Sequence, residues 1–235
     1  MKHTGLLRSI ALSLNKLFTS IQRWKQGIPK GPSYIYNSIA AKFLNPIHAY
    51  VAREAVGTVK TGDVVVDVGC GVGSLITKLL SEVRVHAVGL DISLAMLELA
   101  KNNTRRAGLH GYVDLVLGDA HKLPFRDDGI NLIVSTGTLH HIRRPHEVFK
   151  ECVRVLKNGC EAWIYEFSHD ISPEEAREFS KEFKVSVRYL KLAGLMHGIP
   201  RREFESGYIR KELELVRCPY EVKYRGFLTK LILRK

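Results

Sequence analysis

Three glycines at alternate positions, Gly69, Gly71 and Gly73, follow a run of valines that contains one acidic residue, Asp67. Glycine lets a backbone turn tightly and approach a ligand closely, and the N-terminus of a following helix adds N–H donors. Ser74 stands where the dinucleotide fingerprint G-x-G-x-x-G requires its last glycine, which argues against a nicotinamide or flavin site. Because Asp67 adds a negative charge, the loop suits a cationic ligand better than a diphosphate.

Two further acidic residues follow later β-like runs. Asp91 lies twenty-two residues beyond Gly69, where a carboxylate can accept hydrogen bonds from both ribose hydroxyls of an adenosine group. Asp119 follows the next run and can accept from an adenine amino group. Each acid alone is more often a strand-end cap or a solvated charge. Because the carboxyl ends of parallel strands meet at one edge of a sheet, the sequence predicts one site containing the loop and both acids.

The segments that must position these residues alternate between short β-branched runs and helical patterns. Strands are expected at 63–68, 83–90, 112–117, 131–136 and 161–167, and helices at 72–80, 93–107 and 145–157. This alternation predicts a parallel sheet covered by helices. Residues 172–217 are expected to be helical, and 220–224 with 227–233 to form an antiparallel hairpin at the sheet edge. The predicted fold is α/β, a Rossmann-like doubly wound sheet of seven strands with the last one antiparallel.

Composition limits the class of protein. The 235 residues carry a net charge of +12 that is concentrated at the ends, since residues 1–30 hold six Lys/Arg and no acidic residue. Basic ends favour contact with RNA or an anionic membrane surface, and the alternative is a solubilising surface charge. The four cysteines show no CxxC spacing, which indicates neither a zinc site nor a disulfide framework. Without a secretory signal or an apolar run of about 18 residues, a cytoplasmic protein is expected.

Several stretches of the sequence resemble a known family. VVDVGCGVG at 65–73, Asp91, GDAHKLPFRDD at 118–128 and LIVSTGTLHHI at 132–142 are similar to the successive motifs of class I S-adenosylmethionine-dependent methyltransferases of the UbiE/methyltransferase type 11 group. The resemblance covers roughly residues 46–167. It implies a seven-stranded sheet that ends in a reversed hairpin, and S-adenosylmethionine as the methyl donor. The donor-binding residues that it implies are Asp67, Gly69, Cys70, Gly71, Gly73, Asp91, Ile92, Asp119, Ala120 and Thr136.

The catalytic residue is not identified by these motifs. A sulfonium donor is already activated, so transfer depends mainly on an in-line approach of the acceptor, and a general base is needed only when the acceptor must lose a proton. His140 and His141 follow the fourth strand, and His141 is the candidate expected to face the site. The alternative is that both histidines pack against or cap the next helix. No metal is expected, because adjacent histidines do not easily share one ion.

The acceptor class follows from what the motifs lack. Ser135–Thr138 stands where nucleic-acid amino-methylating relatives carry Asn/Asp-Pro-Pro-Tyr/Phe, and the paired glutamates of arginine methyltransferases are not found. A small-molecule acceptor, which can be lipophilic, is therefore favoured. The alternatives are an RNA or protein methyltransferase, and a donor-binding protein without catalysis.

Two segments outside the motifs are predicted to cover the site. Residues 1–45 are interpreted as an N-terminal helical extension, and residues 46–235 as the methyltransferase domain, in which the helical insertion 172–217 covers the substrate. Residues 6–24 place their apolar side chains on one helical face and basic ones on the other. Such a helix can cover a pocket and lie on an anionic membrane, or it can pack on the protein's own core.

Overall fold

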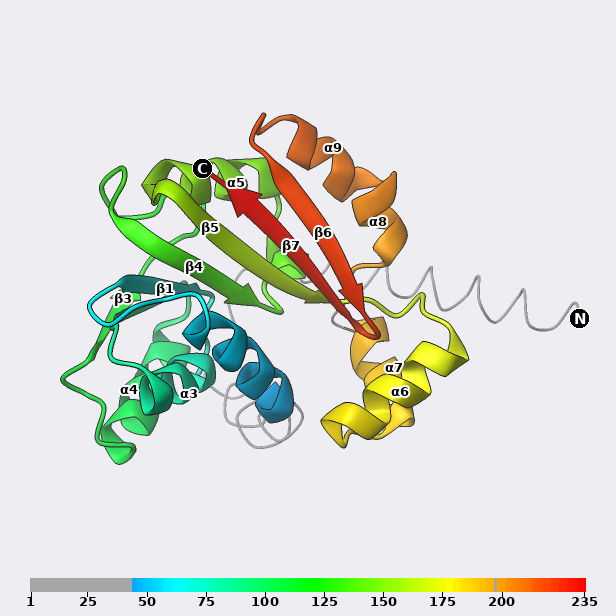
Figure 1. Ribbon diagram of the computed structural model, residues 1–235, viewed down its shortest axis with the longest axis horizontal. Helices are drawn as coiled ribbons and strands as arrows, with labels where there is room; N and C mark the ends of the chain where they lie inside the picture. The colour runs from blue at the N-terminus through cyan, green and yellow to red at the C-terminus, as the bar shows by residue number, and fades with distance from the viewer. Residues whose placement is uncertain (1–43, 197) are drawn as a thin grey trace, which may run out of the picture.

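The computed structural model describes residues 44–196 and 198–235, which form one seven-stranded sheet with helices on both faces (Figure 1). The strands are β1 Val64–Val68, β2 His86–Asp91, β3 Val113–Leu117, β4 Ile130–Thr136, β5 Leu156–Phe167, β6 Tyr220–Arg225 and β7 Leu228–Arg234. Their order is β3-β2-β1-β4-β5-β7-β6. Strands β1 to β5 are mutually parallel, and β7 is antiparallel to both of its neighbours. The predicted fold class is confirmed.

The helices follow the expected alternation with the strands. They are α3 Ser74–Glu82, α4 Leu94–Arg106, the 3-10 turn η1 Leu139–His141, α5 Pro145–Val155, α6 Pro173–Phe183, α7 Val187–Met196, α8 Arg201–Glu205 and α9 Tyr208–Glu214. Residues 44–56 are also helical. Ser93 caps α4 by accepting from the Met96 N–H, and Ser172 forms a capping box with Glu175 at the start of α6. Both caps satisfy N–H groups that have no partner inside the helix.

The largest difference between a predicted and an observed boundary lies where α5 meets β5. The expected helix 145–157 ends at Val155, because Leu156 already pairs with Ile130 and begins β5. The polar segment before Glu161 is extended, although it lacks an apolar strand pattern. Pairing with β4 and a hydrogen bond from the Gly159 N–H to the Lys235 carbonyl, 3.1 Å long, hold this segment at the sheet.

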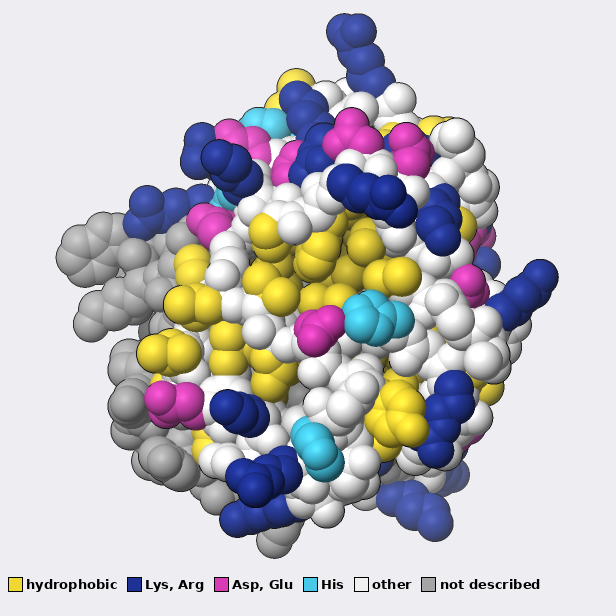
Figure 2. Space-filling view, turned by 90° about the vertical axis from the view of Figure 1, so that its left-hand side faces the viewer, with side chains coloured by type: hydrophobic (Ala, Val, Ile, Leu, Met, Phe, Trp, Pro, Cys, Tyr) yellow, Lys and Arg dark blue, Asp and Glu magenta, His cyan; other side chains and the backbone are white. Residues whose placement is uncertain are grey.

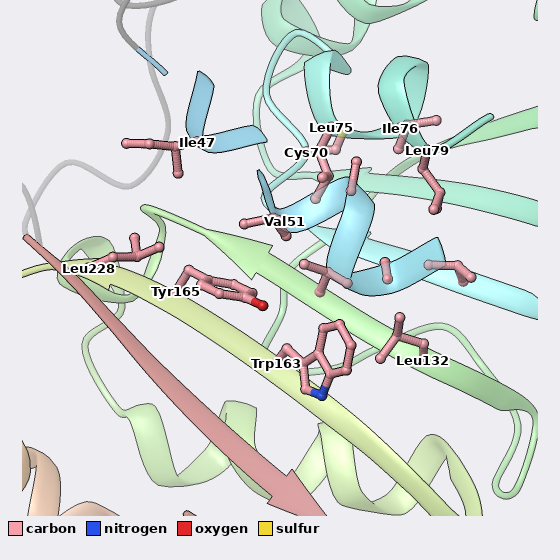
Figure 3. Packing of buried hydrophobic residues seen from close by; sticks show 14 of the residues in the cluster. Ile47, Val51, Cys70, Leu75, Ile76, Leu79, Leu132, Trp163, Tyr165 and Leu228 are labelled. Carbon is pink, nitrogen blue, oxygen red and sulfur yellow. The ribbon is translucent and has the colours of Figure 1, made fainter. Parts of the chain in front are cut away.

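Helix 44–56 covers one face of the sheet together with α3 and α6. Figure 3 shows Ile47 and Val51 of this helix packed above Trp163 and Tyr165 of β5, with Leu132 of β4 beside them. Each of these five side chains is at most 4% exposed, and burying an aliphatic side chain contributes about 1.5–3 kcal/mol. The Tyr165 hydroxyl donates to Oε2 of Glu54 at 2.6 Å and the Trp163 Nε1–H donates to Oε2 of Glu161 at 2.7 Å, so the polar groups of both side chains are satisfied.

The insertion 172–217 is divided between the two faces of the sheet. Phe179 and Phe183 of α6 belong to the apolar cluster of the first face, whereas Phe204 of α8 and Leu213 of α9 belong to the cluster of the second. In Figure 1, α6 and α7 lie beyond the tip of the β6–β7 hairpin, and α8 and α9 lie on the opposite side. The insertion is helical, as predicted, but only α6 and α7 share the face of helix 44–56. Its role as a substrate cover stays a prediction.

The predicted amphipathic helix 6–24, and residues 1–43 of the N-terminal extension, lie outside the described residues. Among the residues that the structure describes, no helix is both long enough and apolar enough to cross a bilayer.

Candidate functional site

The glycine loop follows β1 at the point where the strand order reverses, with β2 on one side of β1 and β4 on the other. Open α/β sheets bind ligands at such a switch point, outside the carboxyl ends of the strands. Gly69, Gly71 and Gly73 have φ values of 75°, 53° and 76°. These left-handed conformations favour glycine, and Gly73 in addition forms the N-cap of α3.

Gly69 and Gly71 face different surroundings. A Cβ atom on Gly69 would lie 2.3 Å from Oγ1 and 2.6 Å from Cγ2 of Thr138, in the loop after β4. A Cβ atom on Gly71 would meet no other atom within 4 Å. Gly69 therefore allows two loops to pack together, while Gly71 borders open space in which a ligand can approach the backbone.

Asp91, the last residue of β2, holds the glycine loop. Its Oδ2 accepts from the Gly71 N–H at 2.9 Å, and its Oδ1 accepts from the Ser93 N–H at 2.8 Å. The Gly69 and Cys70 N–H groups donate to the Leu90 carbonyl at 2.8 and 3.0 Å. Because each carboxylate oxygen can accept more than one hydrogen bond, Asp91 keeps capacity for a ligand hydroxyl.

The site is electronegative. Asp67 and Asp91 are 4% and 9% exposed. Burial, and then the charge of Asp91, raise the pKa of Asp67 to about 8. Burial also raises the pKa of Asp91, against the opposing hydrogen bonds from Ser93 and Gly71. The neighbouring Cys70 belongs to the buried core, and burial raises the pKa of its thiol well above the ordinary value, so the thiol stays neutral.

Apolar side chains are exposed at the neighbouring strand ends. Asp91 pairs with Leu117 in the sheet, and Leu117 and Ile92 are 57% and 43% exposed. Figure 2 views the molecule from the left-hand side of Figure 1, the side of edge strand β3, and shows apolar side chains gathered on this face with both basic and acidic side chains around them. Ala120, just after β3, is half-buried against the core of the second face.

Asp119 lies at the start of the loop after β3. Its Oδ1 accepts from the His121 N–H at 2.9 Å and lies 2.6 Å from Nδ1 of the same residue. Partial burial opposes ionisation of Asp119, but the His121 hydrogen bonds and the positive charge of Arg144 hold its pKa below the ordinary value. The Gly118 N–H donates to the Asp91 carbonyl at 3.1 Å, which joins this loop to the end of β2.

The end of β5, next to β4, carries a buried acidic residue that sequence reasoning did not identify. Glu166 of β5 is 0% exposed, and its Oε2 accepts from the His140 N–H at 3.0 Å and lies 3.0 Å from His140 Nδ1. His140 is buried, whereas His141 is half-buried and its ring centroid lies 4.0 Å from that of His140. The carboxylate therefore orients His140, and the candidate His141 stays a prediction. One signal was present in the sequence: an acidic residue near the end of an otherwise apolar run.

The remaining donor-site candidate, Thr136, ends β4 and is half-buried. Its Oγ1 atom is buried and has no hydrogen-bond partner among residues 44–196 and 198–235. All the sequence-predicted site residues thus lie at the carboxyl ends of β1 to β4 or in the loops that follow them. Within the described parts of the chain, no three His, Cys, Asp or Glu side chains are grouped so that they could hold a metal ion.

Comparison with known proteins places this arrangement in a family. Residues 66–164 match the methyltransferase domain family. Over 138 residues, 58% of this chain, the sequence is 32% identical to demethylmenaquinone methyltransferase of Lactobacillus johnsonii and covers 57% of it. Over 151 residues, 64% of this chain, it is 30% identical to 24-methylenesterol C-methyltransferase 2 of Arabidopsis thaliana and covers 42% of it. The chain thus spans about half the length of these relatives.

Among solved structures, the fold is similar to that of a Methanococcus maripaludis protein assigned to the S-adenosyl-L-methionine-dependent methyltransferases. The TM-score is 0.73 at 22% identity, over 90% of this chain and 95% of that one. A likeness at this identity shows the fold. Residues 66–164 therefore match the methyltransferase domain family, and the predicted resemblance to class I S-adenosylmethionine-dependent methyltransferases is confirmed.

Proposed function

We propose that this chain transfers a methyl group from S-adenosylmethionine to a small, lipophilic acceptor. The observation that carries the proposal is the glycine loop, held by Asp91 at the switch point of a methyltransferase-family sheet and bordering open space at Gly71. The ten donor-site residues predicted from the sequence remain its proposed binding residues.

The charges at this site fit a cationic donor. S-adenosylmethionine carries a sulfonium and an ammonium group, and a positive charge near Asp67 and Asp91 offsets the repulsion that raises the pKa of Asp67. A diphosphate would add negative charge beside the same two buried carboxylates. The electrostatics therefore favour the methyl donor over a dinucleotide.

The strand ends also fit an adenosine group. Asp91 is placed to accept from ribose hydroxyls, and Ile92 and Leu117 offer exposed apolar surface against which an adenine ring can pack. Asp119, just after the next strand, is placed to accept a hydrogen bond from the 6-amino group of the adenine. The Thr136 hydroxyl, which has no partner among the described residues, is an additional group that a bound donor can satisfy.

The donor, when bound, supplies a methyl group on an activated sulfonium. The chain's part is then to hold the acceptor in line, which is worth about 7 kcal/mol or more in well-oriented reactions. If the methyl acceptor must lose a proton, the geometry favours His140, because buried Glu166 fixes its ring. The ring then either takes the proton or positions the group that takes it. His141 then lies beside the ring that the carboxylate orients.

The acceptor class rests on two observations. Two relatives are named for lipophilic acceptors, demethylmenaquinone and 24-methylenesterol. Aromatic side chains also connect helix 44–56, α6 and the β6–β7 hairpin, through contacts of Phe183 with Tyr50 and of Phe179 with Phe227. An RNA acceptor is the second candidate, because another relative is named a probable tRNA methyltransferase and the chain is basic.

Calorimetry with S-adenosylhomocysteine, the demethylated donor, and with NAD tests the binding site. We expect binding of the first at micromolar concentration and none of the second, and the opposite result would end the proposal. Incubation with isotope-labelled donor and fractionated cell extract then identifies the acceptor. Label in lipid-soluble molecules supports the proposal, label in RNA favours the second candidate, and donor binding without any label indicates a non-catalytic binding protein.

A further inference from the structure

His121 makes a double contact with Asp119. The backbone N–H of His121 and its ring Nδ1 both approach the same carboxylate oxygen, Oδ1, at 2.9 and 2.6 Å. The backbone contact alone is common where an aspartate begins a turn. The ring contact adds a charge-assisted hydrogen bond and fixes the carboxylate about its side-chain torsions.

This contact leaves the other oxygen of Asp119 available. The Asp119 side chain is 48% exposed, whereas that of His121 is 12% exposed. A half-exposed aspartate held only by a turn would sample several rotamers and would lose that freedom on binding a ligand. With Oδ1 occupied twice by His121, Oδ2 is held ready for a donor from outside the protein.

The ring of His121 is itself held against the protein. Its Nε2 atom is buried and has no hydrogen-bond partner in the described part of the chain. A buried polar atom without a partner carries a free-energy cost, so the position is not explained by stability alone. The arrangement is understandable if the ring serves to orient Asp119.

We propose that His121 is a positioning residue that aims Asp119 at the 6-amino group of the donor's adenine and so makes donor binding selective for adenine. The inference rests on the proposed function, because it takes Asp119 to be an adenine-binding residue. A merely structural role of His121 would change affinity for every donor-like ligand equally. A positioning role changes the preference for a 6-amino group over a 6-oxo group.

The test compares two ligands by calorimetry: S-adenosylhomocysteine and S-inosylhomocysteine, in which an oxo group replaces the amino group. We expect the unaltered chain to prefer the first by about tenfold or more, because the oxo group cannot donate to a carboxylate. His121→Phe keeps a ring but removes Nδ1, and its preference should fall below about threefold. His121→Asn places an amide N–H near the former Nδ1 and should keep most of the preference.

His86 offers a matched control. It pairs with Asp114 at 3.0 Å, and both side chains are exposed at the opposite end of the same strands. His86→Phe should leave the preference unchanged. If His121→Phe does not fold, His121→Leu replaces it.

A folded His121→Phe chain that keeps the full preference, or that binds both ligands more weakly by the same factor, overturns the inference. An unaltered chain that binds S-adenosylhomocysteine and S-inosylhomocysteine equally well also overturns the inference, while leaving the proposed donor site in place. An unaltered chain that binds neither ligand defeats the proposed function, and the inference fails with it.

Discussion

Replacing Gly69 or Gly71 by alanine separates packing from ligand binding within one loop. Both residues have a positive φ, so both substitutions place a Cβ atom in a left-handed backbone. Only at Gly69 does the new atom meet the protein, at 2.3 Å from Oγ1 of Thr138. The two variants therefore share the cost of the left-handed backbone, and only Gly69→Ala adds the cost of a steric contact with Thr138.

The magnitudes follow from this geometry. A left-handed conformation costs a residue with a Cβ atom about 1–2 kcal/mol, part of which is offset because alanine restricts the unfolded chain. Gly71→Ala should thus lose about 1 kcal/mol of unfolding free energy. Gly69→Ala adds an overpacking cost of about 1–3 kcal/mol and should lose about 2–4 kcal/mol in total.

Chemical denaturation measures these stabilities, and calorimetry with S-adenosylhomocysteine measures binding. Gly71→Ala should weaken binding by at least about tenfold with a small loss of stability, because its methyl group enters the space proposed for the donor. Thr138→Ala, combined with Gly69→Ala, should recover most of the additional stability loss. Thr138→Ala alone is the control, and we expect it to change stability by less than about 1 kcal/mol.

Equal destabilisation by Gly69→Ala and Gly71→Ala, with no recovery by Thr138→Ala, would show that the contact with Thr138 does not constrain the loop. Unchanged binding in a folded Gly71→Ala chain would show that the open side of the loop is not the donor site. The two results test separate steps of the reasoning.

Four further predictions concern the acidic residues. Between pH 3.8, the ordinary pKa of an aspartate, and about pH 8, Asp67 keeps its proton in the folded protein but has lost it in the unfolded chain. The unfolding free energy should therefore fall as pH rises through this range. In thermal melts, Asp67→Asn should reduce this dependence on pH. Binding of the cationic donor should tighten over the same rise, and calorimetry at several pH values that finds no change would contradict this. Asp91→Ala should weaken S-adenosylhomocysteine binding by about 1.5–3 kcal/mol, and equal affinity would show that Asp91 makes no ribose contact. Glu166→Gln should lower turnover about tenfold to a hundredfold while changing donor affinity little, and full turnover would remove His140 from the mechanism.

The fold could be predicted from the sequence because its central strands β1, β2 and β4 are buried on both faces. Such strands appear as short continuous apolar runs, and VVVDV and NLIVST are two examples. The early start of β5 could not be predicted in this way, since Lys157 and Asn158 are polar and extend only because their neighbours pair with β4. Local pattern determines where a strand can form, and pairing determines where it begins.

The helices of the insertion 172–217 could be predicted from the sequence, but their positions on the sheet could not. The sequence marks its helices through the capping box at Ser172 and through amphipathic spacing. It does not mark which face of the sheet each helix covers. That choice depends on Arg201, which forms an ion pair with Glu175 at 2.8 Å and donates to the Gly226 carbonyl at 2.7 Å, and so holds α6, α8 and the hairpin together.

The glycine loop and Asp91 were predictable because their signal is local spacing and strand ends. The Glu166–His140 contact was not, because it joins residues 26 positions apart, one on β5 and the other in η1 after β4. His141 stays a prediction, because both histidines occupy the same loop. Only the pairing of β4 with β5 brings a carboxylate to one of them.

The end of β5 connects the two features that would determine the acceptor. Glu166 binds the loop that carries the histidines, and two residues later Ser168 donates to the Ile199 carbonyl at 2.8 Å, in the segment that leads to α8. Both side chains are 0% exposed, so neither can move without leaving a buried polar group unsatisfied. A substitution that shifts this strand end should therefore displace the histidine loop and the insertion together. Changes of acceptor preference are expected at Ser168 even though its side chain is bonded within the protein. A Ser168→Ala chain that keeps the acceptor preference and turnover of the unaltered chain would show that the two features are independent.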